Sequence, residues 1–436
     1  MTRITAILII TLLPFISRAQ WQSQWTAFQQ ERWVEHISMA DNNTVWITGR
    51  TSGSTSSLSR DFSRTTNGGS TWQAGTIDLL EGFGLGMIHA YDGTTAWACL
   101  QSIADTGGFI IQTTDGGQNW NIQPTAVFSV NPEIIHFFDA DSGLAIGQPH
   151  DGNFEIWVTT DGGNNWDSIP ASDMPLAYDE ERTSHRVYWV KGDSLWFGGS
   201  TNGRIFYSYD RSYHWSFLPF PEPQVHVVVF RDTVGLAGRL DPLLDEYSLY
   251  QTQDQGQTWI KTGAAGLTGI SCMTFVPGTV STILACGDNL MISNDWGASF
   301  LPMEAPQGNQ TCSLIAFRDI STGWLGSVNN TASSQGGIFK YNGPPLQIKN
   351  IAPETRTVIY PNPSPGNATL EITAGKQESI SLQISDLSGK LLSMNQFDLN
   401  PGVNLLPVTA ANLPPGVYIV HWNSNDTIHH NLLVRN

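Results

Sequence analysis

One eight-residue motif recurs six times along the chain and constrains its fold more than any other feature. The copies are TTNGGSTW, TTDGGQNW, TTDGGNNW, SYDRSYHW, TQDQGQTW and SNDWGASF, starting at residues 65, 113, 159, 208, 252 and 293. Their terminal aromatic residues, at 72, 120, 166, 215, 259 and 300, are therefore 48, 46, 49, 44 and 41 residues apart. Self-similarity at this period indicates one supersecondary unit per repeat.

Turn chemistry explains the motif. Its third residue can bond to the backbone of its own turn, glycine adopts positive φ, and the terminal ring fills space between layers. Each copy thus predicts two strands joined by a tight turn. In the fourth copy Arg211 and Ser212 replace the Gly pair, so we expect a differently shaped turn there. The third-position residues, predicted to be structural, are Asn67, Asp115, Asp161, Asp210, Asp254 and Asp295.

An apolar hairpin precedes each copy, and a seventh such hairpin, LIAFRDISTGWLGS, follows the last copy. Seven first hairpins and six second hairpins predict an all-β, seven-bladed β-propeller whose last blade lacks its fourth strand. The segment WQSQWTAFQQ, from Trp21, resembles the missing strand. We therefore expect it to pair into the last blade and close the ring, which removes an exposed sheet edge.

These motifs resemble the Asp-box (BNR repeat) propellers and, within them, the photosystem II assembly and stability factor-like family. The resemblance covers about residues 21–343 and rests on the six boxes and on the F-x-D-x-x-x-G-W/L hairpins at 137–144 and 317–324. It implies the fold but no single function. Sialidases, xyloglucan hydrolases, sorting receptors and assembly factors all belong to the group, and in them the boxes lie at the blade periphery.

The composition changes after Gly343. Residues 344–355 read as a Pro-rich linker, and 356–436 contain short strands separated by Pro and Gly turns. This pattern predicts a small immunoglobulin-like β-sandwich, although a carbohydrate-binding or fibronectin-like module also fits it.

Three motifs in this region, YPNP, DLSGK and LPPGVY, resemble the type A sorting domain of the type IX secretion system. The resemblance implies the type IX machinery as a partner and passage through the periplasm and across the outer membrane. The protein would then be secreted or attached to the outer cell surface. The motif residues are Pro361, Asn362, Pro363, Gly389, Gly416 and Tyr418.

The first nineteen residues read as a signal peptide. Arg3 precedes an apolar run from Ile4 to Ile16, and small residues at Ser17 and Ala19 mark a cleavage site. The run is too short to cross a bilayer, and no later stretch is long and apolar enough, so we expect no transmembrane span. The predicted domains are therefore the signal peptide at 1–19, the propeller at 20–343, the linker at 344–355 and the sorting domain at 356–436.

Charge and cysteine content bound the partners and the redox chemistry. The formal net charge is -17, with only 21 Lys plus Arg, which argues against a nucleic-acid partner. Four cysteines in an exported chain permit disulfides. Cys272 and Cys286 flank a predicted hairpin and would bridge if they faced each other across it. The alternative is that all four cysteines are buried thiols, Cys99 and Cys312 included.

Propellers bind ligands where loops converge over the channel, so the links between blades are the candidate positions. The longest acid-rich link runs from Asp173 to Arg182 and contains Tyr178 and Glu180. Arg50 and Arg239 take corresponding places after second strands, and Arg186 starts the fourth blade. A sialidase-like glycoside hydrolase would need three such arginines, a Tyr nucleophile and an acid. The Arg-Ile-Pro signature of sialidases and the G-x-S-x-G elbow are both missing, so we assign no catalytic residue.

Histidines recur at the starts of the expected innermost strands: His36, His89, His136, His185 and His226. His89 and His136 each lie three residues before a turn acid, so we expect them on corresponding faces of neighbouring blades. No third metal ligand and no calcium loop accompany them, so we expect neither a metal nor a cofactor. We expect Trp21, Trp25, Trp33 and Tyr178 at exposed positions, where their rings suit stacking on sugars or packing against a protein.

The sequence thus predicts an exported propeller that binds or assembles with a glycan or protein ligand. The alternative is an exported glycoside hydrolase. The candidate ligand-binding residues are Arg50, His89, His136, Tyr178, Glu180, Arg186 and Arg239.

Overall fold

The structure of the chain is a computed structural model. The chain divides into two compact units, residues 1–348 and 349–436. The predicted signal peptide lies outside the described residues. The structure describes residues 20–51, 58–178, 180–241, 246–263, 267, 270–286, 289–306, 312–332, 335–346, 358–374, 377–386, 390–400, 402–424 and 427–436.

The first unit consists of β-strands that pair in groups of four along the chain. We call these groups blades, and the one 3-10 turn in the described part, η1 (Ala171–Asp173), lies between the third and fourth. The first blade is β2 (Trp33–Met39), β3 (Val45–Arg50), β4 (Leu58–Thr65) and β5 (Gln73–Thr76); the second is β6 (Phe83–Ala90), β7 (Ala96–Ser102), β8 (Gly108–Thr113) and β9 (Asn121–Phe128). The third is β10 (Pro132–Phe137), β11 (Gly143–His150), β12 (Asn153–Thr159) and β13 (Asp167–Ser168); the fourth is β14 (Tyr188–Lys191), β15 (Ser194–Gly198), β16 (Arg204–Ser208) and β17 (Ser216–Pro219).

The remaining blades complete the unit. The fifth is β18 (Val227–Arg231), β19 (Val234–Asp241), β20 (Glu246–Thr252) and β21 (Ile260–Lys261); the sixth is β22 (Ile270–Phe275), β23 (Thr282–Cys286), β24 (Asn289–Ser293) and β25 (Leu301–Met303). The closing blade is β26 (Leu314–Phe317), β27 (Gly323–Asn330), β28 (Gln335–Tyr341) and β1 (Trp21–Trp25). The all-β class is confirmed. The count of seven stays a prediction, because bridges join the closing, first and second blades into one 12-stranded sheet.

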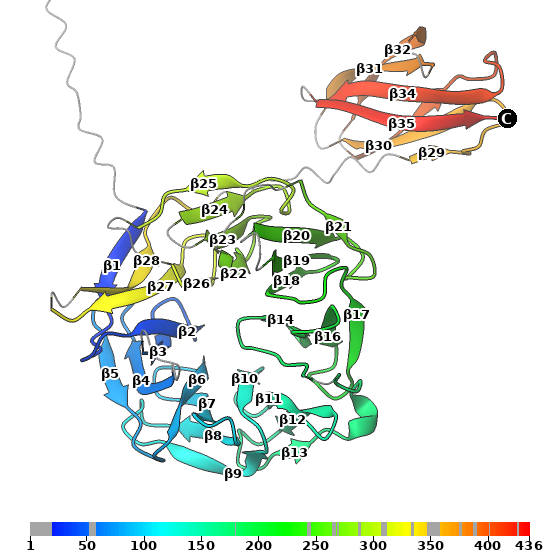
Figure 1. The fold of residues 1–436 in the computed structure, drawn as a ribbon. Coiled ribbons are helices and arrows are strands. Elements are labelled where there is room, and N and C mark those ends of the chain that lie inside the picture. The colour runs from blue at the N-terminus through cyan, green and yellow to red at the C-terminus, as the bar shows by residue number, and fades with distance from the viewer. Residues whose placement is uncertain are drawn as a thin grey trace, which may run out of the picture. The chain divides into compact units, whose positions relative to one another are not determined.

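Figure 1 shows the blades following one another around a ring, with their first strands innermost and their last strands at the rim. The ring closes where β1 pairs with β28, from Trp21 opposite Tyr341 to Trp25 opposite Gly337, as predicted. Trp21 is not exposed as expected. It is only 5% exposed and packs edge-on against Phe317 and Tyr341, because closing the ring covers its indole.

The six motif copies fold into one kind of hydrogen-bonded turn. In the third copy Thr159 Oγ1 donates to Asp161 Oδ1 over 3.0 Å and accepts from the Gly163 N–H over 3.0 Å. The fourth copy was expected to differ, and that expectation is wrong. In the fourth copy the hydroxyl of the first residue donates to Asp210 Oδ1 over 2.8 Å and accepts from the Ser212 N–H over 2.9 Å. Arg211 and Ser212 adopt φ of 60° and 79°, the left-handed region that glycine occupies in the third copy.

The glycine of the apolar hairpins has a packing reason. A Cβ on Gly143 would lie 2.7 Å from the Phe137 ring, and a Cβ on Gly323 would lie 2.4 Å from the Phe317 ring. The aromatic residue of the F-x-D-x-x-x-G motif therefore covers the glycine across its own hairpin. The Phe137 ring also stacks on Trp97 of the second blade with centroids 3.6 Å apart, so the same residue joins two blades.

The second unit is a pair of antiparallel sheets around one apolar core. The three-stranded sheet is β29 (Val358–Tyr360), β30 (Ala368–Ala374) and β33 (Gly402–Val408). The four-stranded sheet, in spatial order, is β32 (Leu391–Leu399), β31 (Glu378–Ser385), β34 (Gly416–Ser424) and β35 (Thr427–Arg435).

Two of the predicted motif residues hold this second unit together. The Asn362 amide donates to the Leu432 carbonyl and accepts from the Val434 N–H, both over 2.8 Å. The Tyr418 hydroxyl donates to the Pro414 carbonyl over 2.6 Å. Asn362 thereby fastens the start of the unit to its last strand. Gly389 lies outside the described residues.

The strand register bears on the predicted disulfide. Ala285 lies opposite Cys272, and Cys286 lies opposite Ile270. The Cys286 side chain is outside the described ones, so the bridge stays a prediction. Within the described residues, no helix has the length and apolar character needed to cross a membrane.

Candidate functional site

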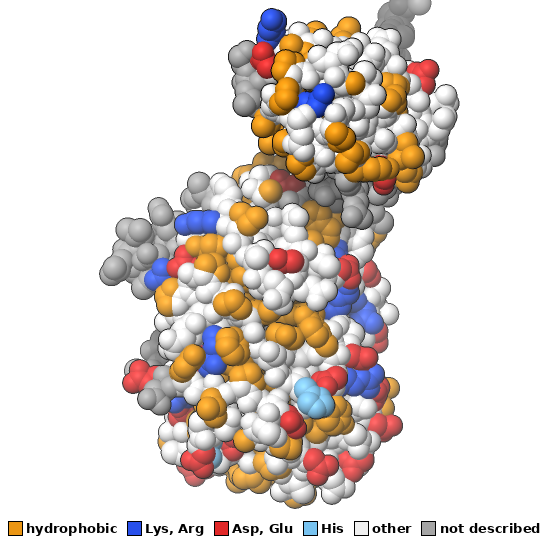
Figure 2. Space-filling model, turned by 90° about the vertical axis from the view of Figure 1, so that its right-hand side faces the viewer, with side chains coloured by type: hydrophobic (Ala, Val, Ile, Leu, Met, Phe, Trp, Pro, Cys, Tyr) orange, Lys and Arg blue, Asp and Glu red, His pale blue; other side chains and the backbone are white. Residues whose placement is uncertain are grey.

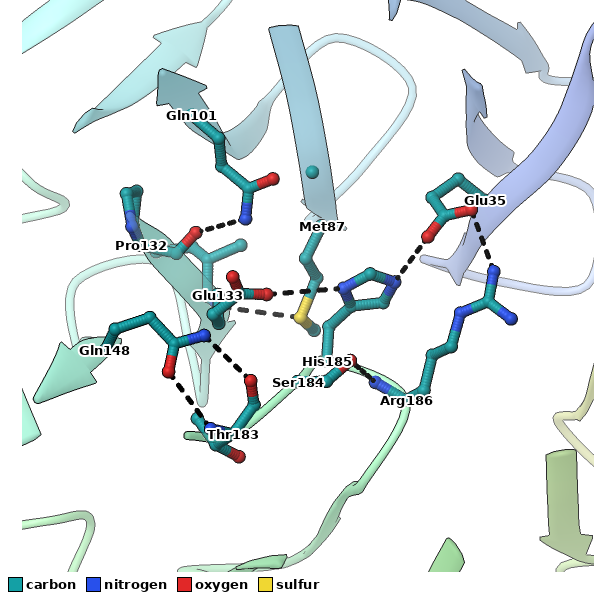
Figure 3. Close-up of polar contacts among 12 residues, drawn as sticks. Glu35, Met87, Gln101, Pro132, Glu133, Gln148, Thr183, Ser184, His185 and Arg186 are labelled. Carbon is teal, nitrogen blue, oxygen red and sulfur yellow. Dashed lines mark hydrogen bonds and ion pairs between the residues drawn. The ribbon is translucent and has the colours of Figure 1, made fainter. Parts of the chain in front are cut away.

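The link between the third and fourth blades carries two charged residues into the middle of the ring. Two hydrogen bonds tie the Thr183 backbone to the Gln148 amide, 2.9 and 3.1 Å long. The Val187 N–H then donates to the Ser184 carbonyl over 2.9 Å and closes a turn. His185 and Arg186 form the tip of that turn. Figure 3 shows them pointing toward the first blade, where Glu35 lies.

Five side chains meet at this tip, and we call them the channel cluster: Glu35, Arg50, Glu133, His185 and Arg186. Glu35, on β2, lies 2.9 Å from Arg50 Nε and 2.8 Å from Arg186 Nη2. His185 lies between the two carboxylates, with Nε2 3.3 Å from Glu35 and Nδ1 3.9 Å from Glu133. The cluster therefore joins strands of the first and third blades to the link before the fourth (Figure 3).

The cluster carries an excess of positive charge. Burial by itself would raise the pKa of Glu35, but His185, Arg186 and Arg50 lower it to about 2. Burial by itself would lower the pKa of His185, but the carboxylates of Glu133 and Glu35 raise it to about 9. Three cationic groups, Arg50, Arg186 and protonated His185, thus face two carboxylates at neutral pH.

Three further histidines nearby are neutral. Burial lowers the pKa of His36 to about 3 and that of His89 to about 4, and it holds the pKa of His136 well below its usual range. The His89 and His136 rings are 4.7 Å apart, on neighbouring blades as predicted. The Tyr188 hydroxyl lies 2.7 Å from His136 Nδ1. His36 Nδ1 has no hydrogen-bond partner among the described residues.

A cavity of about 390 Å³ adjoins the cluster. Its wall comes from the inner strands β2, β10, β14, β22 and β26 and from the tip of the link. Both polar and apolar side chains line this wall. The polar set includes His36, His136, His185, Arg186 and Tyr188, and the apolar set includes Met39, Trp189, Met273 and Ile315. Such a mixture of apolar wall and a few polar groups is typical of a ligand pocket.

The structure brings some of the predicted site residues together and separates others. Arg50 and Arg186 meet at Glu35, whereas Arg239 pairs with Glu222 over 3.2 Å. Two of the three arginines that the sialidase-like interpretation required therefore share one carboxylate inside the protein, and the third pairs with another.

The acid-rich link is also organised differently from the prediction. The ring of the exposed Tyr178 lies 4.0 Å from the Arg204 guanidinium, which is paired with the fully buried Glu181. Glu180 is exposed, at φ of 63°. Tyr178 thus packs on Arg204 at the surface, and neither Tyr178 nor Glu180 lines the cavity.

Sequence reasoning missed Glu35 and Glu133 and did not include His185 among the candidate ligand residues. Their signal was weak, because each acid is a single charge in an apolar strand. His185 is itself one of the recurring histidines and Glu35 directly precedes another, His36, so that pattern did indicate the channel wall. Among the described residues, no group of three or more His, Cys, Asp or Glu is arranged to hold a metal ion.

Comparisons with known proteins match the two parts of the chain to different proteins. Residues 358–435 match the family model of the secretion system C-terminal sorting domain. This part of the chain is a type IX sorting domain, which implies export to the cell surface or beyond. No curated protein matches the chain in sequence.

The propeller resembles solved structures of YCF48. One, described as YCF48 bound to D1 peptide, has a TM-score of 0.54 and 15% identity and covers 76% of this chain and 99% of its own. A second, YCF48 from Cyanidioschyzon merolae, has a TM-score of 0.54 and 15% identity and covers 74% of this chain and 99% of its own. At this identity the likeness shows a shared propeller fold.

Proposed function

We propose that this protein is an exported binding module that holds a protein segment or a glycan at the channel cavity. The observation that carries the proposal is the meeting of Glu35, His185 and Arg186 beside a cavity with both apolar and polar walls. The sorting domain delivers this module to the outside of the cell.

The side chains that line the cavity favour the binding of a ligand. Its histidines His36 and His136 are neutral, and the Tyr188 hydroxyl is engaged with His136, so the polar wall offers fixed hydrogen-bonding groups. Trp189 and Met273 supply apolar area. A protein segment is the preferred ligand, since one similar propeller is described as bound to a peptide. A sugar ring is the second class that such a pocket suits.

The test is binding of the full chain to two arrays, one of overlapping peptides from cell-surface proteins and one of glycans. The Arg186→Gln variant removes a cationic group from the cavity wall. We expect it to weaken binding at least about tenfold, as for a buried charged contact. Arg182→Gln is the matched control, because Arg182 lies in the same link but pairs with Asp105 outside the cavity, 2.9 Å away.

The control should change affinity by less than about twofold, as for an exposed pair. Equal affinities for wild type and both variants would place the ligand elsewhere. Thermal unfolding of each variant separates a lost contact from a lost fold. A glycan recovered in cleaved form would favour the glycoside hydrolase alternative instead.

A further inference from the structure

The cavity in the middle of the ring has a cationic wall. Arg186 and His185 are the charged side chains among the described residues that line it, and none of these lining residues is an Asp or a Glu. Glu35 and Glu133 pair with the two cations but do not line the cavity. A group inside the cavity therefore meets the positive charges directly and the two carboxylates only at longer range.

Arg186 has hydrogen-bond donors to spare. Its Nη2 atom pairs with Glu35 over 2.8 Å, and the described residues offer this guanidinium no other acceptor. A guanidinium carries five N–H donors in a fixed fork that matches the two oxygens of a carboxylate. The side chain is 27% exposed and lines the cavity. Arg186 can therefore hold Glu35 and a second anion at the same time.

The charges of the channel cluster leave an excess of one positive charge. Arg50, Arg186 and protonated His185 are the cations, and two carboxylates face them. Figure 3 shows these carboxylates, of Glu35 and Glu133, on opposite sides of the His185 ring. A singly charged anion would bring the sum to zero. A cation would increase the excess, and a phosphate group with a charge of about -1.5 to -2 would reverse it.

This excess of positive charge is local. The whole chain has a formal net charge of -17. Figure 2 shows acidic and basic side chains interspersed over the visible side of the first unit. Surface arginines of this unit pair with acids, as Arg182 does with Asp105 over 2.9 Å. Because a protein of negative net charge repels an acidic ligand in general, a cationic cavity determines where such a ligand binds.

Apolar side chains form much of the remaining wall, Trp189 and Met273 among them. We propose that the channel cavity binds its ligand through one carboxylate, which Arg186 holds, while an apolar part of the same ligand packs on this wall. The carboxylate is that of an acidic side chain beside an apolar residue in a protein segment. The inference rests on the proposed function of the cavity and adds the chemical class of the group that is bound.

The test uses the full chain and three small probes that share a phenyl ring and differ in their end group: 3-phenylpropanoate, 3-phenylpropanamide and 3-phenylpropylamine. The cavity of about 390 Å³ has room for such molecules, because ligand pockets begin at about 300 Å³. We expect the carboxylate to bind at least about tenfold more tightly than the amide, since its hydrogen bonds to Arg186 are charge-assisted. The amine should bind more weakly than either. Isothermal titration calorimetry at low salt measures the three affinities.

Arg186→Gln should lower the affinity for the carboxylate at least about tenfold and leave the affinity for the amide within about twofold. The amide thus reports whether the cavity itself survives the substitution. Arg182→Gln is the control, because Arg182 lies in the same link and pairs with Asp105 outside the cavity. This control should bind both probes within about twofold of wild type, as expected for the loss of an exposed pair.

An amide that binds wild type as tightly as the carboxylate does would overturn the proposal. Absence of carboxylate binding at about 10 mM would do so too, because a small ligand in a fitting site reaches a dissociation constant of about 1 mM or lower. An equal loss of both probes in an Arg186→Gln protein with unchanged thermal unfolding would also refute it. Tighter binding of phenylphosphonate than of 3-phenylpropanoate would overturn the choice of a singly charged group.

The peptide array separates this inference from the proposed function. Peptides that bind the cavity equally well after their Glu and Asp residues are changed to Gln and Asn would support the binding module and overturn the carboxylate. Carboxylate binding by the probes, with no peptide or glycan bound on either array, would support the inference and count against the proposed function. Array ligands that lose at least about tenfold in affinity on the same changes support both.

Discussion

His185 illustrates how two carboxylates determine the state of one buried side chain. It lies between Glu35 and Glu133, which raise its pKa to about 9, whereas the neighbouring His36 has a pKa lowered to about 3. The two rings are 5.7 Å apart. Protonated His185 itself helps to keep His36 neutral, so a charged and an uncharged histidine stand side by side at the cavity wall.

These opposite shifts predict a stability maximum near pH 6.5. Above the unfolded-state pKa of about 6.5, folded His185 still holds a proton that the unfolded chain has lost, so stability falls as pH rises toward 9. Below about pH 6.5 the unfolded chain protonates His36 and His89 while the folded protein does not, so stability falls again. The alkaline loss should amount to about 2–3 kcal/mol. Denaturant unfolding from pH 5 to 9.5 measures it.

His185→Gln isolates the contribution of this group. The variant should be less stable than wild type at pH 6.5, and its stability should change much less between pH 6.5 and 9. A wild-type curve that is flat over that interval, or a variant curve parallel to the wild-type one, would contradict the assigned pairing. The acid-side loss due to His36 should become smaller in the variant, because the charge of His185 no longer lowers the pKa of His36. The part due to His89 should remain, because burial alone causes that shift, and it serves as the internal control.

At the scale of single elements, the six motif turns share one geometry with different strain. In five copies glycine occupies the second left-handed position, although Gln255 and Trp296 occupy the first in the fifth and sixth copies. In the fourth, Ser212 adopts φ of 79° and its buried hydroxyl oxygen has no partner among the described residues. Left-handed backbone costs an L-residue about 1 kcal/mol or more, and an unsatisfied buried hydroxyl costs a similar amount.

Ser212→Gly should therefore stabilise the protein by about 1 kcal/mol, because it relieves both costs and keeps the backbone bonds of the turn. Arg211→Gly is the contrasting variant. It also relieves a positive φ, but it removes ion pairs to Asp139 and Asp193, so its net effect should be close to zero. Thermal unfolding compares the three proteins. A destabilised Ser212→Gly would mean that packing of the Cβ outweighs the strain.

The turns and the channel cluster differ in how far the sequence predicts them. The turn is local chemistry: Thr159, Asp161 and Gly163 lie within five residues, so its repetition predicted the strands, their period and the closing strand. The channel cluster depends on a contact between Arg186 and Glu35, which are 151 residues apart. Nothing in either local sequence identifies the other. The error at the fourth turn has a physical cause too, since shared hydrogen bonds impose the left-handed backbone on residues that disfavour it.

At the scale of the whole molecule, closure of the ring depends on a short strand from the far end of the chain. β1 supplies the outermost strand of a blade whose other strands begin at Leu314. Trp21 anchors it: the indole N–H donates to the Glu304 carbonyl over 3.0 Å, and the ring packs against Phe317 and Tyr341. Without β1, the edge of β28 would be exposed as a template for other strands.

Trp21→Ala should thus lower the free energy of unfolding by about 3–5 kcal/mol, the usual cost of emptying a buried aromatic site. Trp25→Ala is the matched control, because Trp25 is a half-buried tryptophan on the same strand and should cost only about 1–2 kcal/mol. Denaturant unfolding measures both. The Trp21 variant should also associate at high concentration, as light scattering would show, because a loosened β1 uncovers the β28 edge. Equal losses in the two variants would mean that the strand is held by its backbone pairing, and that the Trp21 anchor adds nothing to closure.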